Sequence, residues 1–170
     1  MIFVTVGSQG PFDRLIRTVD EWASLRGRSD VFAQIGNTKY VPKHIQFTGF
    51  VEPPKFTSLV QQARVVVAHA GIGSILSALE LGKQIVVMPR RAKFREQRND
   101  HQVSTAKHFG SQGRVIVADD EQTFPDRLDF ALTQANPGRI SLEASPMLIA
   151  ALRSFLDGNL DPENLGTVLK

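Results

Sequence analysis

The chain has 170 residues, of which 42% are hydrophobic and 22% are charged, and this composition is ordinary for a globular domain. It contains no cysteine, which excludes disulfides, thiolate metal sites and a cysteine nucleophile and is consistent with the cytoplasm. The net charge is +3, and no apolar run approaches the roughly 20 residues that span a bilayer.

Strand patterns alternate with amphipathic helical patterns along the chain. A β-branched run predicts a first strand at 2–6, and apolar residues at 3.6-residue spacing predict a helix over 12–23. Similar patterns predict strands at 31–35, 45–47, 64–68, 84–88 and 115–117, and helices at 55–62, 72–81, 100–109, 121–135 and 145–157. This alternation predicts a single Rossmann-like α/β domain over 1–170, a parallel sheet with helices on both faces. Its core is expected in 1–135 and a loose tail in 158–170.

Two glycine-rich turns follow predicted strands. The donors and glycines that they contain are Gly7, Ser8 and Gln9 in the first turn and Gly71, Gly73 and Ser74 in the second. Ligands of parallel sheets bind beyond the carboxyl ends of the strands, and a glycine turn that leads into a helix offers free N–H groups to phosphate. Each turn is therefore interpreted as a diphosphate seat, with an ordinary strand-to-helix turn as the alternative.

The sequence lacks the motifs that mark several other kinds of site. Neither turn has the G-x-G-x-x-G pattern with a downstream acid or the G-x-x-x-x-G-K-[ST] pattern. No histidine and carboxylate spacing predicts a metal site, and no G-x-S-x-G motif predicts a serine nucleophile.

Three further features carry polar chemistry. His69 ends the buried strand at the ligand edge of the sheet, so both a structural and a functional role stay open, the latter including catalysis. A polar cluster at a helix start can bind sugar hydroxyls or simply cap the helix, and it comprises Asn99, Asp100, His101 and Gln102. A basic run suits phosphate or anionic lipid, or is a solvated loop, and it comprises Arg90, Arg91, Lys93, Arg95 and Arg98.

These motifs together resemble a known family. The opening run from Phe3 to Gln9 and the H-A-G-I-G-S motif at 69–74 resemble the small donor-binding, catalytic subunits of two-component GT-B glycosyltransferases. The segment from Met88 to Gln102 resembles the bacterial exopolysaccharide branch of that group. Residues 1–135 are similar to the C-terminal half of the GlcNAc transferase that forms lipid II.

The resemblance implies a function and a set of site residues. It implies an inverting hexosyltransferase subunit, independent of metals and cofactors, that moves a sugar from a UDP-sugar to a polyprenyl-diphosphate-linked saccharide. The two glycine turns would then lie at the donor diphosphate, and His101 and Gln102 at the donor sugar. Many relatives have a ribose-binding glutamate where this chain has Ser77, so either Ser77 or Glu80, one helical turn later, is the expected ribose contact.

The resemblance also implies a partner. In full-length relatives the catalytic base lies in the acceptor-binding half, so the base and the lipid acceptor site are expected on a membrane-anchored partner subunit and not on this chain. The chain would be cytoplasmic and recruited to the inner face of the plasma membrane, with the basic run facing the partner or the lipid, and no nucleic acid is expected. One alternative is a non-catalytic, nucleotide-binding regulatory subunit; a sugar-nucleotide epimerase is another, although epimerases carry both halves in one chain.

Overall fold

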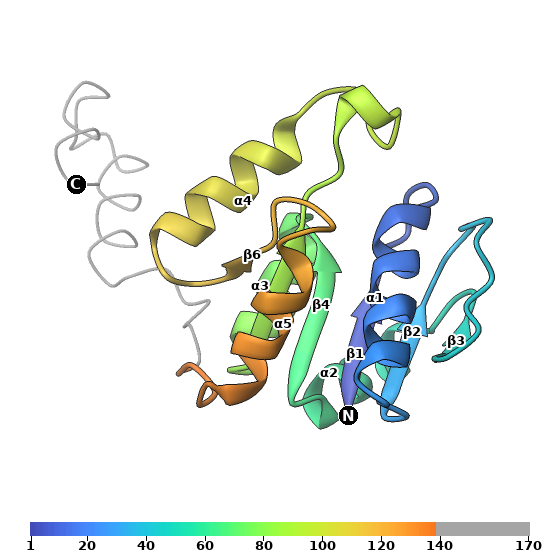
Figure 1. Ribbon diagram of the computed structural model, residues 1–170. Coiled ribbons are helices and arrows are strands. Elements are labelled where there is room, and N and C mark those ends of the chain that lie inside the picture. Colours follow the sequence, from blue (N-terminus) through green and yellow to red (C-terminus); the bar gives the residue numbers. More distant parts are fainter. Residues whose placement is uncertain (139–170) are drawn as a thin grey trace, which may run out of the picture. The chain divides into compact units, whose positions relative to one another are not determined.

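The computed structural model describes residues 1–138, which form an α/β sandwich (Figure 1). The strands are β1 (Ile2–Thr5), β2 (Val31–Gln34), β3 (Gln46–Thr48), β4 (Val65–His69), β5 (Gln84–Met88) and β6 (Ile116–Val117). The helices are α1 (Asp13–Leu25), α2 (Pro53–Gln62), α3 (Ile72–Glu80), α4 (His101–Ser111) and α5 (Phe124–Thr133), with a 3-10 turn η1 (Ala92–Phe94).

The strands form one six-stranded parallel sheet in the order β3-β2-β1-β4-β5-β6. The chain therefore builds outward from β1 through β2 to β3, and then returns to the other side of β1 to place β4, β5 and β6. The strand order reverses between β1 and β4. In open parallel sheets a crevice forms at such a reversal, beyond the carboxyl ends of the two strands.

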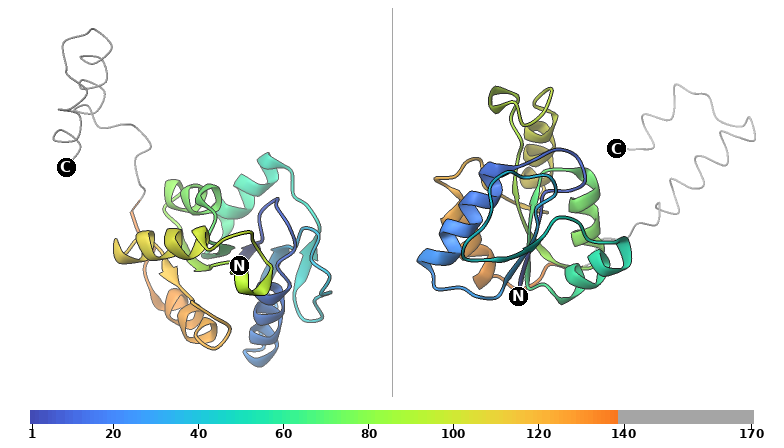
Figure 2. Two further views of the ribbon diagram at one scale, coloured as in Figure 1. Left: turned by 90° about the horizontal axis from the view of Figure 1, so that it is seen from above. Right: turned by 90° about the vertical axis from the view of Figure 1, so that its right-hand side faces the viewer.

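Alternate strand residues supply two separate apolar layers. On one face, Val4 and Val67 pack with α1 and α5 through residues such as Ile16 and Leu128. On the other face, Phe3, Val66 and Val87 pack with α2, α3 and α4. Figure 2 (right) shows α1 and α5 on one side of the sheet and α2 and α3 on the other. The predicted parallel sheet with helices on both faces is confirmed.

Element ends differ in places from the sequence prediction. Gly110 was expected to end the fourth predicted long helix, but it lies inside α4, because helical hydrogen bonding continues to Ser111. The helix expected over 121–135 is shorter, because an Asp120–Thr123 hydrogen-bonded turn precedes α5. The predicted helix at 145–157 and the tail at 158–170 lie outside the described residues.

A buried carboxylate ties α1 to the segment between β2 and β3. Asp20 is fully buried, and its two oxygens accept hydrogen bonds from the Tyr40 hydroxyl (2.8 Å) and from the backbone N–H groups of Lys43 (2.9 Å), His44 (2.7 Å) and Ile45 (3.1 Å). The segment between β2 and β3 has little regular secondary structure, so its backbone N–H groups lack β-sheet partners, and Asp20 supplies the acceptors instead.

No helix within residues 1–138 combines the length and apolarity that a membrane crossing requires.

Candidate functional site

A cleft of about 600 Å³ lies where the strand order reverses, at the carboxyl ends of β1 and β4. Most of the sequence-predicted site residues line it, namely Gly7, Ser8, Gln9, His69, Gly71, Gly73, Ser74, Ser77, His101 and Gln102. Two predicted residues do not line it. Asp100 instead accepts the backbone N–H of Ala92 (2.8 Å), and Glu80 lies at the far end of α3.

The first glycine turn presents backbone donors to this cleft. Gly7 has a φ of 74°, in the left-handed region that glycine adopts most readily, and its N–H donates to the Thr5 hydroxyl (3.1 Å). Within residues 1–138 no acceptor meets the N–H groups of Ser8, Gln9 or Gly10. Three successive donors are therefore free for an anionic ligand.

The second glycine turn leads directly into α3. The first helical bond runs from the Ile75 N–H to the Gly71 carbonyl (3.1 Å), so the earlier N–H groups of the helix are free, as at any helix N-terminus. Ser74 adds a hydroxyl on the cleft wall. Ser77 also lines the cleft, but its hydroxyl donates to the Gly73 carbonyl (2.9 Å). The two turns thus converge on one cleft with the partial positive charge of α3 behind the second.

His69 lies between the two turns. A Cβ added to Gly7 would lie 2.5 Å from His69 Cε1, and one added to Gly71 would lie 2.8 Å from His69 Cδ2, so each turn approaches the ring as closely as only glycine allows. Burial, helped by the positive charge of Arg90, lowers the pKa of His69 to about 4, while the backbone of Thr5 has the opposite, smaller effect. The ring is neutral at pH 7, and a base of such low pKa accepts protons poorly there.

The depressed pKa of His69 makes folding stability depend on pH. Because the unfolded state binds the proton more tightly, the contribution is complete above about pH 6.5 and is lost as the pH falls to about 4. A depression of this size corresponds to roughly 3 kcal/mol. We expect urea unfolding at pH 7, 6, 5 and 4 to show this loss in the wild type. His69→Asn should flatten it, and an equally steep loss in that variant would assign the pH dependence to other groups.

The start of α4 holds Gln102 in a fixed orientation. Gln102 is buried, and its Oε1 accepts the backbone N–H of Arg90 (3.1 Å). Since that backbone donor requires an acceptor, the amide NH₂ is the end left for a ligand. The Asn99 side chain meanwhile accepts the N–H of exposed His101 and contacts its ring.

The cleft contains residues that the sequence interpretation missed. Gln34, at the carboxyl end of β2, donates to the Gly7 carbonyl (3.3 Å) and has a buried Oε1 without a hydrogen-bond partner in the described chain. Phe50 is 60% exposed although it is aromatic, and Phe56 and Thr57 of α2 lie on the same wall. The position of Gln34 at a strand end was a usable signal, whereas nothing local marked Phe50.

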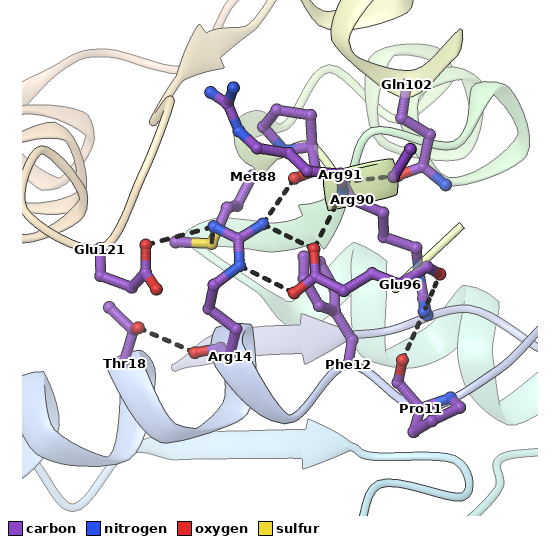
Figure 3. A network of polar contacts seen from close by, with 12 residues as sticks. Pro11, Phe12, Arg14, Thr18, Met88, Arg90, Arg91, Glu96, Gln102 and Glu121 are labelled. Carbon is purple, nitrogen blue, oxygen red and sulfur yellow. Dashed lines mark hydrogen bonds and ion pairs between the residues drawn. The ribbon is translucent and has the colours of Figure 1, made fainter. Parts of the chain in front are cut away.

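The basic run does not form one exposed surface, which corrects the sequence interpretation of Arg90. Arg90 is only 1% exposed, so it is not available to lipid or a partner, and its guanidinium binds backbone carbonyls inside the domain (Figure 3). Arg91 donates to the Asp119 carbonyl (2.8 Å). The other three, Lys93, Arg95 and Arg98, are exposed and form no ion pair within residues 1–138.

Histidines are the only titratable side chains among the described residues that line the cleft. No Asp, Glu, Lys or Arg is among the described residues that line it. Within residues 1–138 no three histidine or carboxylate side chains are grouped closely enough to hold a metal ion. The chemistry that the cleft offers is therefore hydrogen bonding from backbone N–H groups, amides and hydroxyls.

Strand order, reversal point and paired glycine turns define a Rossmann-like domain of the kind that binds nucleotides at its carboxyl edge. Residues 1–155 match the glycosyltransferase family 28 C-terminal domain, and the chain belongs to this family. Its fold is that of the C-terminal domain of GT-B glycosyltransferases.

Two curated relatives are named UDP-N-acetylglucosamine transferase subunit ALG13. The chain is 32% identical to the protein from Homo sapiens over 125 residues, covering 68% of this chain and 11% of the relative. It is 28% identical to the protein from Yarrowia lipolytica over 132 residues, covering 71% and 65%. The chain thus spans less than two thirds of the length of either relative.

Solved structures show the same fold. An NMR structure of ALG13 matches with a TM-score of 0.58 at 20% identity, covering 89% of this chain and 94% of that one. The glycosyltransferase of kitacinnamycin matches with a TM-score of 0.55 at 25% identity, covering 77% and 33%. The UDP-GlcNAc 2-epimerase from Methanocaldococcus jannaschii matches with a TM-score of 0.61 at 11% identity, covering 92% and 45%.

Proposed function

We propose that this chain is the donor-binding subunit of a glycosyltransferase, which holds a UDP-sugar in the cleft at the β1–β4 reversal. The observation that carries the proposal is the convergence of two glycine turns, both with free N–H groups, on one cleft in a member of a glycosyltransferase family. In this arrangement the donor diphosphate lies between the Gly7–Gly10 turn and the N-terminus of α3.

The remaining cleft residues divide between the two ends of the donor. His101 and the NH₂ group of Gln102 are proposed to bind the sugar hydroxyls. The exposed ring of Phe50 is proposed to stack on the base, and Ser77 is the proposed ribose contact in place of Glu80.

The proposed chemistry is an inverting displacement, in which the acceptor hydroxyl attacks the anomeric carbon while the nucleoside diphosphate leaves. Free N–H groups at both turns would stabilise the charge that develops on the leaving diphosphate. The attacking hydroxyl needs a base, but no carboxylate is among the described residues of the cleft, His69 has a pKa of about 4, and His101 is assigned to the donor sugar. We therefore assign the base to a partner subunit, and His69 to the support of the two turns.

The proposed partner is membrane-anchored and carries a polyprenyl-diphosphate-linked saccharide. Both relatives have the word subunit in their names, which supports a heteromeric enzyme. The exposed cations Lys93, Arg95 and Arg98 are proposed to face the partner or the lipid diphosphate, which would recruit the chain from the cytoplasm to the inner face of the plasma membrane.

The names of the relatives support UDP-GlcNAc as the donor. Transfer to a bacterial exopolysaccharide intermediate rests on the segment Met88–Gln102 alone. A non-catalytic, nucleotide-binding subunit is the second candidate, and the serine at position 77 favours it, because no carboxylate in the cleft can bind the ribose hydroxyls.

Calorimetric titration of the full chain with UDP, ADP and NAD tests the proposal. We expect UDP to bind more tightly than ADP and NAD, because the chain belongs to a glycosyltransferase family and its relatives are named for UDP-N-acetylglucosamine. Tighter binding of ADP or NAD would contradict the glycosyltransferase assignment. UDP binding without sugar transfer in the assembled complex would favour the regulatory subunit.

Removing two side-chain donors from the cleft should weaken the binding of UDP. Gln9→Ala combined with Ser74→Ala removes two hydrogen bonds to a charged group, at a cost on the order of 3 kcal/mol or roughly 150-fold in Kd. The matched control is Ser104→Ala combined with Gln112→Ala, two exposed residues outside the cleft, one within α4 and the other directly after it. Equal UDP affinities in the two double variants would remove the glycine turns from the proposed site.

Sugar transfer should require a second protein. We expect the purified chain to transfer negligible label from UDP-[14C]GlcNAc to a polyprenyl-diphosphate-linked acceptor, because the base and the acceptor site are proposed to lie on the partner and no carboxylate is among the described residues of the cleft. Addition of membranes that contain the partner should restore transfer. Efficient transfer by the chain alone would place the base within this chain and contradict the two-component proposal.

A further inference from the structure

The proposed donor site lacks an obvious counter-charge. A nucleoside diphosphate is a multivalent anion, yet no lysine or arginine lines the cleft in the described part of the chain. Backbone N–H groups and one helix N-terminus supply only partial charges. A cation behind the cleft wall would supply the full positive charge that the lining residues lack.

Arg90 lies behind the first glycine turn. It follows β5 and Pro89, and its guanidinium donates to the carbonyls of Val6 (2.9 Å), Gly10 (3.0 Å) and Pro11 (2.5 Å) while lying 4.7 Å from the centre of the Phe12 ring. A Cβ added to Gly10 would lie 3.5 Å from its Nη1. Arg90 thus holds both ends of the turn from inside the domain, and Figure 3 shows its contact with Pro11.

The charge of Arg90 is not neutralised by a direct ion pair. All its side-chain acceptors are backbone carbonyls, and within residues 1–138 no carboxylate lies within ion-pair distance of it. The nearest acid, Glu96, binds Arg14 through both oxygens (2.8 and 2.9 Å) and also accepts the Arg91 N–H (2.9 Å) (Figure 3). Arg14 also contacts Glu121 (3.3 Å), and Glu96 attracts Arg90 only from beyond ion-pair distance, so Arg90 has no direct carboxylate partner.

A buried cation without a carboxylate partner is costly, so it calls for a reason. Its field is strong, because the surrounding protein screens it less than water would. That field reaches the cleft, since Arg90 contributes to the lowered pKa of His69, whose ring lies between the two turns.

We propose that Arg90 is a positioning residue for the donor: from behind the cleft wall it holds the Gly7–Pro11 turn in shape and acts as the buried counter-charge of the diphosphate. This inference rests on the proposed function, and it concerns the phosphate-binding part of that site. It predicts that Arg90 discriminates ligands by their phosphate charge while touching none of them.

Binding measurements on the full chain separate charge from shape. Wild type, Arg90→Met, Arg90→Gln and Arg90→Lys are titrated with UDP, uridine and inorganic pyrophosphate. We expect Arg90→Met to weaken UDP and pyrophosphate by about tenfold or more and to leave uridine nearly unchanged. Arg90→Lys keeps the positive charge but not the planar set of guanidinium N–H donors, and it should recover part of the lost affinity. Arg90→Gln, whose amide still donates to carbonyls, replaces the methionine variant if that variant does not fold.

An NMR titration of His69 provides a readout without ligand. The pKa of His69 should rise in Arg90→Met and Arg90→Gln, and should stay low in Arg90→Lys, if the charge reaches the cleft. Equal UDP affinity and equal His69 pKa in the lysine and neutral variants would contradict the counter-charge role. A purely structural role depends on the guanidinium hydrogen bonds, which all of these variants lose.

The same titrations distinguish failure of the inference from failure of the proposed function. If ADP binds more tightly than UDP while pyrophosphate affinity still depends on Arg90, the proposed function is contradicted and the inference is supported. Wild-type affinity of the neutral variants for UDP and pyrophosphate would overturn the inference alone. Absence of UDP and pyrophosphate binding to the wild type would overturn both.

Discussion

Gly71→Ala is expected to disable the cleft. An added Cβ would overlap the His69 ring, lying 2.8 Å from Cδ2 and 3.0 Å from Cε1. The ring cannot move away easily, because Gly7 closes its other side. Gly71 has φ −86° and ψ 134°, which any residue adopts, so the effect is steric and not a backbone strain. We expect a loss of about 3 kcal/mol in the free energy of unfolding and, in the assembled enzyme, roughly a 100-fold loss of transfer from misplaced donor groups.

Gly73→Ala is the matched control for this prediction. A Cβ at Gly73 would meet nothing within 4 Å, and the residue lies in the first turn of α3. Alanine there should leave stability unchanged or raise it by up to about 1 kcal/mol. Chemical unfolding of both variants, and of Gly71→Ala combined with His69→Ala, completes the experiment. The double variant should recover most of the lost stability, and equal stability of the two glycine variants would contradict the close packing of His69.

Asp20→Ala is expected to cost about 4 kcal/mol in the free energy of unfolding. The fully buried carboxylate accepts four hydrogen bonds, and its loss leaves the N–H groups of Lys43, His44 and Ile45 without acceptors. Glu21→Ala, on the exposed side of the same helix, should change stability by less than about 0.5 kcal/mol. Urea unfolding of the three proteins at pH 7 measures both effects.

The stability difference between wild type and Asp20→Ala should itself depend on pH. Burial acts to raise the pKa of Asp20, but the hydrogen bonds from Lys43, Tyr40 and His44 outweigh it, so the pKa lies below its usual value. The carboxylate therefore stabilises the fold fully above about pH 4, and the contribution is lost as the pH falls through the depressed pKa. A difference that stays constant down to pH 2 would show that side-chain volume, and not the carboxylate, stabilises this region.

The layout of the sheet was predictable because its signals are local. Apolar runs such as residues 65–68 indicate strands covered on both faces, and a strand-helix alternation leaves few topologies open. The two glycine turns were recognisable for the same reason, since each immediately follows a strand and precedes a helix. Their assignment to a donor diphosphate stays a prediction.

The direction of individual side chains was not predictable from neighbours in the chain. Arg90 and Arg95 belong to one basic run, yet Arg90 is buried and Arg95 is exposed with a φ of 57°. The difference arises because the carbonyls that receive Arg90 come from residues about 80 positions earlier in the chain. Gln34 and Phe50 joined the cleft in the same way, through the pairing of β2 and β3 beside β1.

By itself, then, the sequence determined the class of fold, the positions of the two glycine turns and the resemblance to glycosyltransferases, because hydrophobic periodicity, glycine positions and short motifs are properties of neighbouring residues. The tertiary structure decided which residues share a cleft, which end of Gln102 accepts a backbone hydrogen bond, how His69 lies between two glycines and that Arg90 is buried. These outcomes depend on burial and on contacts between distant segments, which only the folded sheet brings together.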